Sequence, residues 1–106
     1  MNFGYLYLLM NILIFKDKYD VNIYLSHERW KHIASEHPIV SNKIEEIRET
    51  LLNPTTIKES EYDINVKYYY KYLKSEKKYL FVIVKYLNNK GYIVTSYYVD
   101  FIKGTK

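Results

Sequence analysis

The first part of the chain has the hydrophobic pattern of two short strands. An apolar run at residues 11–14 is followed by a polar turn at residues 16–20, and residues 21–25 then alternate between apolar and polar side chains. Alternation with a period of two is typical of a half-buried strand. The two segments are therefore predicted to pair as a hairpin.

A helix is predicted directly after this hairpin. Ser26 is a good N-cap residue, and Glu28 would lie in the first turn, where a carboxylate complements the helix dipole. These signals predict a helix from His27 to about Glu36. Pro38 ends it, because the residue before a proline is pushed out of the α region. His37 is therefore expected to have left the helix already.

A second helix and several strands complete the pattern. Apolar side chains recur at helical spacing from residue 40 to residue 51. Ser41 or Asn42 is the predicted N-cap, and the helix is expected to stop at Asn53-Pro54. Strands are predicted at residues 55–59, 64–73, 78–87 and 92–99. Together these elements predict an α+β fold, in which two N-terminal helices pack on a four- to five-stranded antiparallel sheet.

Length and composition are those of a single globular domain. The 106 residues are predicted to form one domain, residues 1–106, in which residues 1–9 are a dispensable extension if Met10 is the true start. The apolar segment 3–15 is short for a membrane span of about 20 residues and lacks the features of a signal peptide. The chain contains no cysteine. We therefore expect no membrane association and, by default, a cytoplasmic location.

Charge and aromatic content suit a nucleic acid partner. The net charge is +4, and the chain has 14 tyrosines. Residues 67–72 interleave tyrosine with lysine, as expected of a surface that stacks bases and contacts phosphates. The alternative to a binding surface is a compositional one: tyrosine and lysine are abundant throughout this chain, and tyrosine is a good strand residue in any case.

The candidate chemistry lies in residues 26–38, which contain all three histidines. His27 is assigned to the first helical position as a cap residue. Arg29 and His32 are expected side by side on the exposed face of the helix, and His37 could turn toward either His32 or the sheet. Two imidazoles and a cation are sufficient in kind for RNA cleavage without a metal, because one takes the proton of the 2′-hydroxyl and the other protonates the leaving oxygen.

Other interpretations of the histidines remain open. A histidine near a helix end is often a surface or structural residue. Metal binding is not predicted, because His32 and His37 are five positions apart and do not match the helical His-x-x-x-His spacing. No cofactor is predicted either.

Further site residues are expected on the sheet. Thr95 and Tyr97 would share one face of the last strand, where they could hydrogen-bond a phosphate and stack a base. Lys85 interrupts the apolar run of the neighbouring strand, so it is expected to lie at the end of that strand, to extend its ammonium group to solvent, or to face a site. Tyr69 and Lys71 are assigned to the same substrate-binding surface.

Several motifs resemble a known family. Their order along the chain is Ile23-x-Leu25, Arg29-Trp30-x-His32-Ile33, His37-Pro38, Leu52-x-x-Pro54, Ile57-x-x-Ser60, Tyr68-Tyr69, Val82-x-Val84-Lys85 and Val94-Thr95-Ser96-Tyr97. This set, over residues 21–104, resembles the phage-associated nuclease-like domains grouped with barnase, EndoU, colicin tRNases and RelE (the BECR fold).

The resemblance implies a small metal-independent ribonuclease, of the kind found as toxins of toxin–antitoxin or phage-conflict systems. It implies that His32 and His37 are acid–base residues, that Arg29 and Lys85 contact phosphate, and that Thr95 and Tyr97 line the site. The partners would be RNA (tRNA or mRNA) and an antitoxin or immunity protein. Two departures are Ile39, where the family usually has an acidic residue, and the short end of the chain after Ile102.

The sequence thus supports three hypotheses. The first is an endoribonuclease that cleaves RNA by attack of the 2′-hydroxyl. The second is a non-catalytic RNA- or protein-binding module of the same fold, which would use Tyr69 and Lys71. The third is a protein-interaction domain whose histidines are structural.

Overall fold

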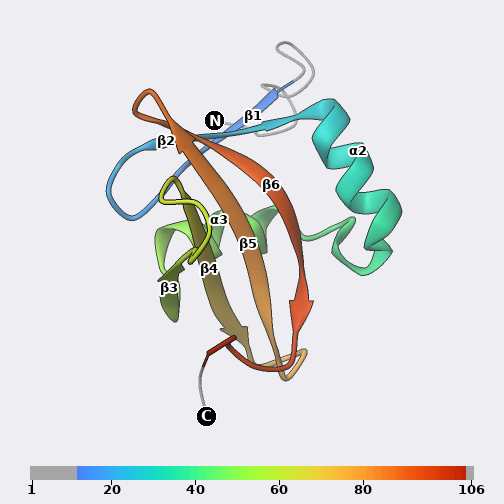
Figure 1. The fold of residues 1–106 in the computed structure, drawn as a ribbon. Helices are drawn as coiled ribbons and strands as arrows, with labels where there is room; N and C mark the ends of the chain where they lie inside the picture. The colour runs from blue at the N-terminus through green and yellow to red at the C-terminus, as the bar shows by residue number, and fades with distance from the viewer. Residues whose placement is uncertain (1–11, 105–106) are drawn as a thin grey trace.

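The computed structural model describes residues 12–104, so residues 1–9, predicted as an extension, and Met10 lie outside the described residues. Figure 1 shows the course of the chain. The elements are β1 (Ile12–Lys16), β2 (Asn22–Ser26), α2 (His27–Glu36), the 3-10 helix η1 (Pro38–Val40), α3 (Ile44–Leu52), β3 (Thr56–Glu59), β4 (Val66–Leu73), β5 (Lys78–Leu87) and β6 (Lys90–Val99).

Helix α2 begins and ends where the sequence predicts. The Ser26 hydroxyl accepts a hydrogen bond from the backbone N–H of Arg29 at 3.1 Å, which satisfies one of the free N–H groups of the first turn. At the other end, His37 has left the helix, with φ −132° and ψ 71°. Pro38 then starts η1, which precedes α3. The side chain of His37 is thereby free to point away from the helix.

The sheet differs from the predicted one. All six strands form a single sheet in the order β1-β2-β6-β5-β4-β3. Strand β2 pairs with β6 in parallel, with Ile23 opposite Gly91 and Tyr24 opposite Tyr92, whereas the other neighbours are antiparallel. The prediction of two N-terminal helices on a four- to five-stranded antiparallel sheet is therefore wrong. The helices follow the first hairpin, and the sheet is mixed and six-stranded.

The parallel contact depends on Gly91. A Cβ on this residue would lie 2.9 Å from Cγ1 of Val84 and closer still to Cδ1 of Ile23. A side chain at residue 91 would force the side chains of Ile23 and Val84 to shift, so glycine favours the close approach of β6 to β2. This contact joins the N-terminal hairpin to the β3–β6 meander.

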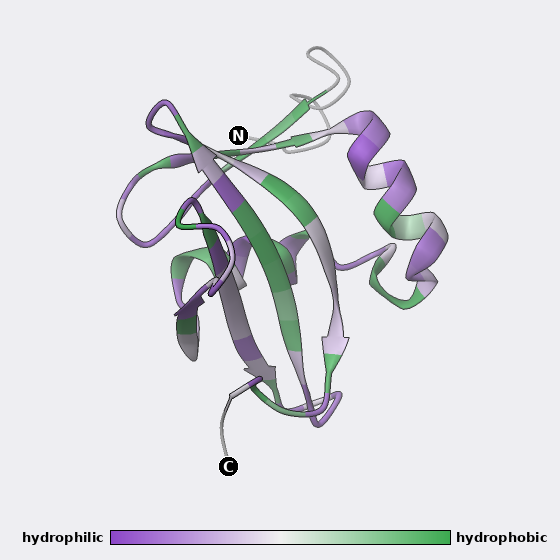
Figure 2. Ribbon diagram, viewed as in Figure 1, coloured by the Kyte–Doolittle hydropathy of each residue, from purple (hydrophilic) through white to green (hydrophobic). Residues whose placement is uncertain are grey.

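One face of the sheet carries the main core. Alternate residues of β4 and β5, such as Tyr69, Leu80 and Val82, are fully buried on this face together with Ile47 and Leu51 of α3. Helix α3 lies behind the sheet in the view of Figure 1, and α2 runs beside β6. Figure 2 shows the hydrophobic stretch of β5 in the middle of the sheet. None of the described helices has the length and apolar character needed to cross a membrane.

The opposite face carries a second set of aromatic side chains, and we call it the open face. Strand register places Tyr68 beside Ile83, Tyr70 beside Phe81, and Phe81 beside Tyr97 on this side. The open face consists of Tyr68, Tyr70, Tyr72, Tyr79, Phe81, Ile83, Lys85, Thr95, Tyr97 and Val99.

Candidate functional site

The predicted residue His37 lies at the margin of the open face. Its imidazole stacks on the ring of Tyr97, with the centroids 4.8 Å apart and the planes 29° apart. Two local causes produce this contact. Pro38 ends α2 so that residue 37 leaves the helix, and strand alternation points Tyr97 to the open face. The structure thus brings together one predicted histidine and one predicted sheet residue.

Arg29 and Lys85 meet in a second part of the open face. Both line a hollow of about 380 Å³, together with Tyr24, Tyr92 and Val94. Within residues 12–104 the Arg29 guanidinium forms no ion pair, so its charge is available to an anionic ligand. The two predicted phosphate contacts therefore come from distant parts of the chain and share one hollow.

Lys85 already has a partner in the β3–β4 loop. Its Nζ donates a hydrogen bond of 2.8 Å to Oδ2 of Asp63. This bond and the bond from the backbone N–H of Asn65 hold the pKa of the Asp63 carboxyl below its usual value. An anionic ligand that approaches Lys85 would compete with Asp63 for the ammonium group.

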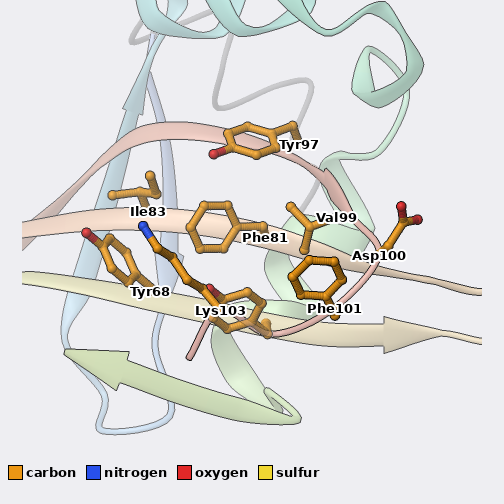
Figure 3. A pocket seen from close by; sticks show the side chains of 9 residues that line it. Tyr68, Phe81, Ile83, Tyr97, Val99, Asp100, Phe101 and Lys103 are labelled. Carbon is orange, nitrogen blue, oxygen red and sulfur yellow. The ribbon is translucent and has the colours of Figure 1, made fainter. Parts of the chain in front are cut away.

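A larger hollow lies next to His37 and Tyr97 on the open face. It has a volume of about 520 Å³, and Figure 3 shows Tyr68, Phe81 and Tyr97 around it, with Phe101 and Lys103 of the C-terminal segment. We call it the aromatic pocket. Thr95 pairs with Ile83 and lies on the same face, between this pocket and the Arg29–Lys85 hollow.

His32 is separate from this arrangement. Its Nε2 lies 3.1 Å from Oε1 of Glu36 on the same helix, and about half of each side chain is exposed. Residues four apart face each other on a helix, so this pair is a local surface contact. His32 lines neither the aromatic pocket nor the Arg29–Lys85 hollow. Arg29 and His32 lie three residues apart and exposed on α2, as predicted, but His32 contacts Glu36 and does not line the hollow of Arg29.

Tyr69 and Lys71 lie on the helix-covered face of the sheet. Tyr69 is opposite Val82 and fully buried, and Lys71 donates to the carbonyl oxygen of Asn53 at 2.8 Å. Neither side chain reaches the open face. Among three consecutive tyrosines, the outer two, Tyr68 and Tyr70, point to the open face, where Tyr68 is partly exposed and Tyr70 is itself buried. Sequence reasoning missed them because an all-tyrosine run gives no indication of which phase of the alternation is buried.

The residues at the C-terminal end were also missed. Phe101 and Lys103 line the aromatic pocket, although both lie beyond the last strand. The only signal in the sequence is an aromatic residue and a lysine in a short polar tail. Within residues 12–104 no group of three or more histidine, aspartate or glutamate side chains is arranged to hold a metal ion.

Comparisons of the chain with family models, with curated proteins and with solved structures each find no match. The resemblance to BECR-type nucleases therefore stays a prediction.

Proposed function

We propose that the protein binds single-stranded RNA along the open face and cleaves it there, with His37 as the group that takes up a proton. The observation that carries the proposal is the stacking of His37 on Tyr97 at the edge of a sheet face rich in aromatic rings. This contact brings an imidazole, which can accept a proton in catalysis, next to a set of aromatic rings of the kind that stack bases.

Binding is supported by the composition of the open face. Tyr68 and Tyr97 offer partly exposed rings on β4 and β6, with the buried ring of Phe81 between them, and Arg29 and Lys85 supply positive charge at one end of the face. Proteins that bind single strands combine stacking rings with a basic groove in this way. The net charge of +4 adds general attraction for a polyanion.

Cleavage would proceed by internal transesterification. His37 removes the proton from a ribose 2′-hydroxyl, the 2′-oxygen attacks the adjacent phosphorus, and the bond to the 5′-oxygen breaks to leave a 2′,3′-cyclic phosphate. Arg29 lines the separate hollow with Lys85, so it would contact a neighbouring phosphate of the bound strand and not the reacting one. The departing 5′-oxygen takes its proton from water, because His32 lines neither the aromatic pocket nor the Arg29–Lys85 hollow.

The test compares cleavage and binding in two histidine variants. His37→Ala should lower the cleavage rate of a labelled RNA by about 10²- to 10⁴-fold, with RNA affinity within about twofold of the wild type. His32→Ala is the matched control and should cleave at the wild-type rate. Equal cleavage by His37→Ala and the wild type would refute the role of His37. Loss of binding together with cleavage would instead make His37 a binding residue.

A second candidate function is RNA binding without cleavage. The position of His32 favours this candidate. The sequence predicted a site with two histidines, but within residues 12–104 only one of the two, His37, contacts the open face, whereas His32 contacts Glu36. In that case wild-type protein would bind RNA with a marked salt dependence but leave it intact. The same labelled RNA distinguishes the two candidates.

A further inference from the structure

The aromatic pocket has the size and lining of a small-ligand site. Its volume of about 520 Å³ falls within the range of such sites, about 300–1,000 Å³. Three strands of the open face form its floor, and the segment after β6 forms one wall (Figure 3). The ligand class that it would accept can be inferred from the rings, the charges and the polar atoms around it.

The rings of the floor lie at several angles to one another, and the ring of Phe81 is buried. Phe81 lies edge-on to Tyr97, at 5.2 Å and 72°, and tilted against Tyr68, at 5.5 Å and 57°. Phe101 is 71% exposed, and its ring stacks on no other ring of the described residues. An exposed, unstacked phenylalanine beside a hollow is a suitable partner for a flat ligand, which would remove its apolar surface from water.

The charges of the pocket favour an anion. Lys103 forms no ion pair within residues 12–104. The carboxylate at the rim, Asp100, is engaged by Lys78 at 2.6 Å. Among the described residues that line the pocket, one lysine without an ion pair therefore remains and the one carboxylate is neutralised, which suits a flat ligand that carries negative charge.

The polar atoms gather at one end of the pocket. In Figure 3 the hydroxyls of Tyr68 and Tyr97 and the ammonium of Lys103 lie toward Ile83, whereas Phe101 lies at the other end. Lys85 follows Ile83 by two residues on the same strand and face, about 7 Å farther along. The polar end of the pocket is thus the end that faces the Arg29–Lys85 hollow.

We propose that the aromatic pocket binds one unpaired nucleobase of the RNA strand, and this inference rests on the proposed function. The base stacks on Phe101 and contacts the rings of the floor, with its polar edge at the hydroxyls of Tyr68 and Tyr97. The phosphate backbone then continues toward Lys85 and Arg29. A strand bound in this way brings its sugar and phosphate past His37, which stacks on the Tyr97 ring at the pocket margin.

The test uses a short single-stranded 2′-O-methyl RNA, which cannot be cleaved, and a series in which each base in turn is replaced by an abasic site. For the wild type, one abasic position should lower the affinity by about 5- to 150-fold, since stacking of a base is worth that much. Phe101→Ala should lower the affinity for the intact RNA by a similar factor and should lose the sensitivity to that position. Tyr19→Ala, which removes a ring 62% exposed in the β1–β2 turn, is the matched control and should bind as the wild type does.

Two results would overturn the base site. Either Phe101→Ala binds the intact RNA as tightly as the wild type, or all abasic positions have equal effects. Should His37→Ala still abolish cleavage in that case, the proposed function stands and only the base pocket falls. A wild-type protein that neither binds nor cleaves RNA would refute both proposals. Because Phe101 is exposed, the melting temperature of Phe101→Ala should equal that of the wild type, which separates a lost contact from misfolding.

Discussion

The His37 imidazole and the Tyr97 phenol ring stack at 4.8 Å, and this contact joins the end of α2 to the open face. The ring of Tyr97 restricts the orientation of the imidazole, so Tyr97 is inferred to be a positioning residue for His37. Aromatic pairs of this kind are worth about 0.5–1.5 kcal/mol.

Replacement of Tyr97 should therefore affect cleavage through the ring and not through the hydroxyl. Tyr97→Ala is expected to lower kcat by about two- to tenfold, because the imidazole loses its stacking partner, and also to raise KM, because the pocket loses a wall. Tyr97→Phe keeps the ring and should retain a wild-type kcat. Steady-state cleavage of a labelled RNA measures both constants. Equal kcat values for the two variants would show that the ring does not position His37.

Asp63 is expected to limit RNA binding through its bond to Lys85. Asp63→Asn removes the competing carboxylate, so the affinity for single-stranded RNA should rise, and the slope of log K against log salt should steepen by about 0.7, the value for one further phosphate contact. The measurement is a salt titration by fluorescence anisotropy. Asp20→Asn removes the same charge from the β1–β2 turn and should change neither the affinity nor the slope.

The same carboxyl contributes to acid stability. The pKa of Asp63 is held below its usual value of 3.8, mainly by the hydrogen bond from Lys85, so its contribution is present above that pH and is lost as the pH falls through the folded-state pKa. Asp63→Asn should lack this part of the acid dependence. Unfolding curves below pH 5 would reveal the difference. Identical curves for the two proteins would contradict it.

Two tyrosines beside the buried carboxyl group of Asp17 should make the stability of the fold sensitive to alkali. Asp17 is 3% exposed and accepts hydrogen bonds from the backbone N–H groups of Tyr19 and Val21 and, at 2.8 Å, from the hydroxyl of Tyr86. Burial raises the pKa of Tyr69 to about 12, and burial likewise raises the pKa of Tyr86. These phenols are neutral in the folded protein.

Stability should therefore decline at high pH. Because the folded-state pKa values are raised, the contribution of these tyrosines is complete below pH 10 and is lost as the pH rises from 10 through about 12. Denaturant unfolding at increasing pH measures the decline. Tyr86→Phe should lower the free energy of unfolding at neutral pH by about 1.5–3 kcal/mol, the value of a hydrogen bond to a charged group, and should flatten the alkaline decline. Tyr62→Phe, at a position 89% exposed, should do neither.

Local features of the fold follow from local sequence signals. The Ser26 cap, the helix His27–Glu36 and the departure of His37 from the helix are set by residues within one or two turns of each other, so they could be predicted. The alternation that puts Thr95 and Tyr97 on one face is likewise a property of a single strand. The parallel pairing of β2 with β6 was missed, because it joins residue 23 to residue 91 and leaves no signal in either segment alone.

The candidate site shows the same division. Arg29, His37, Lys85, Thr95 and Tyr97 were predicted from residue type, and the structure places all five on or beside the open face. Of the other predicted members, Tyr69 and Lys71 lie on the covered face, and His32 lies exposed on α2 in contact with Glu36. In a strand of consecutive tyrosines and lysines, either set of alternate residues could be the buried one, and only the helix that covers one face of the sheet decides which.

By itself the sequence determined the local elements and the set of side chains that carry charge, rings and imidazole. The tertiary structure decided which of these side chains meet. Gly91 permits β6 to approach β2, α3 covers the face that contains Tyr69, and the C-terminal segment brings Phe101 and Lys103 to the open face. Each of these contacts joins residues distant in the chain, and close packing rather than local conformational preference selects among the alternatives.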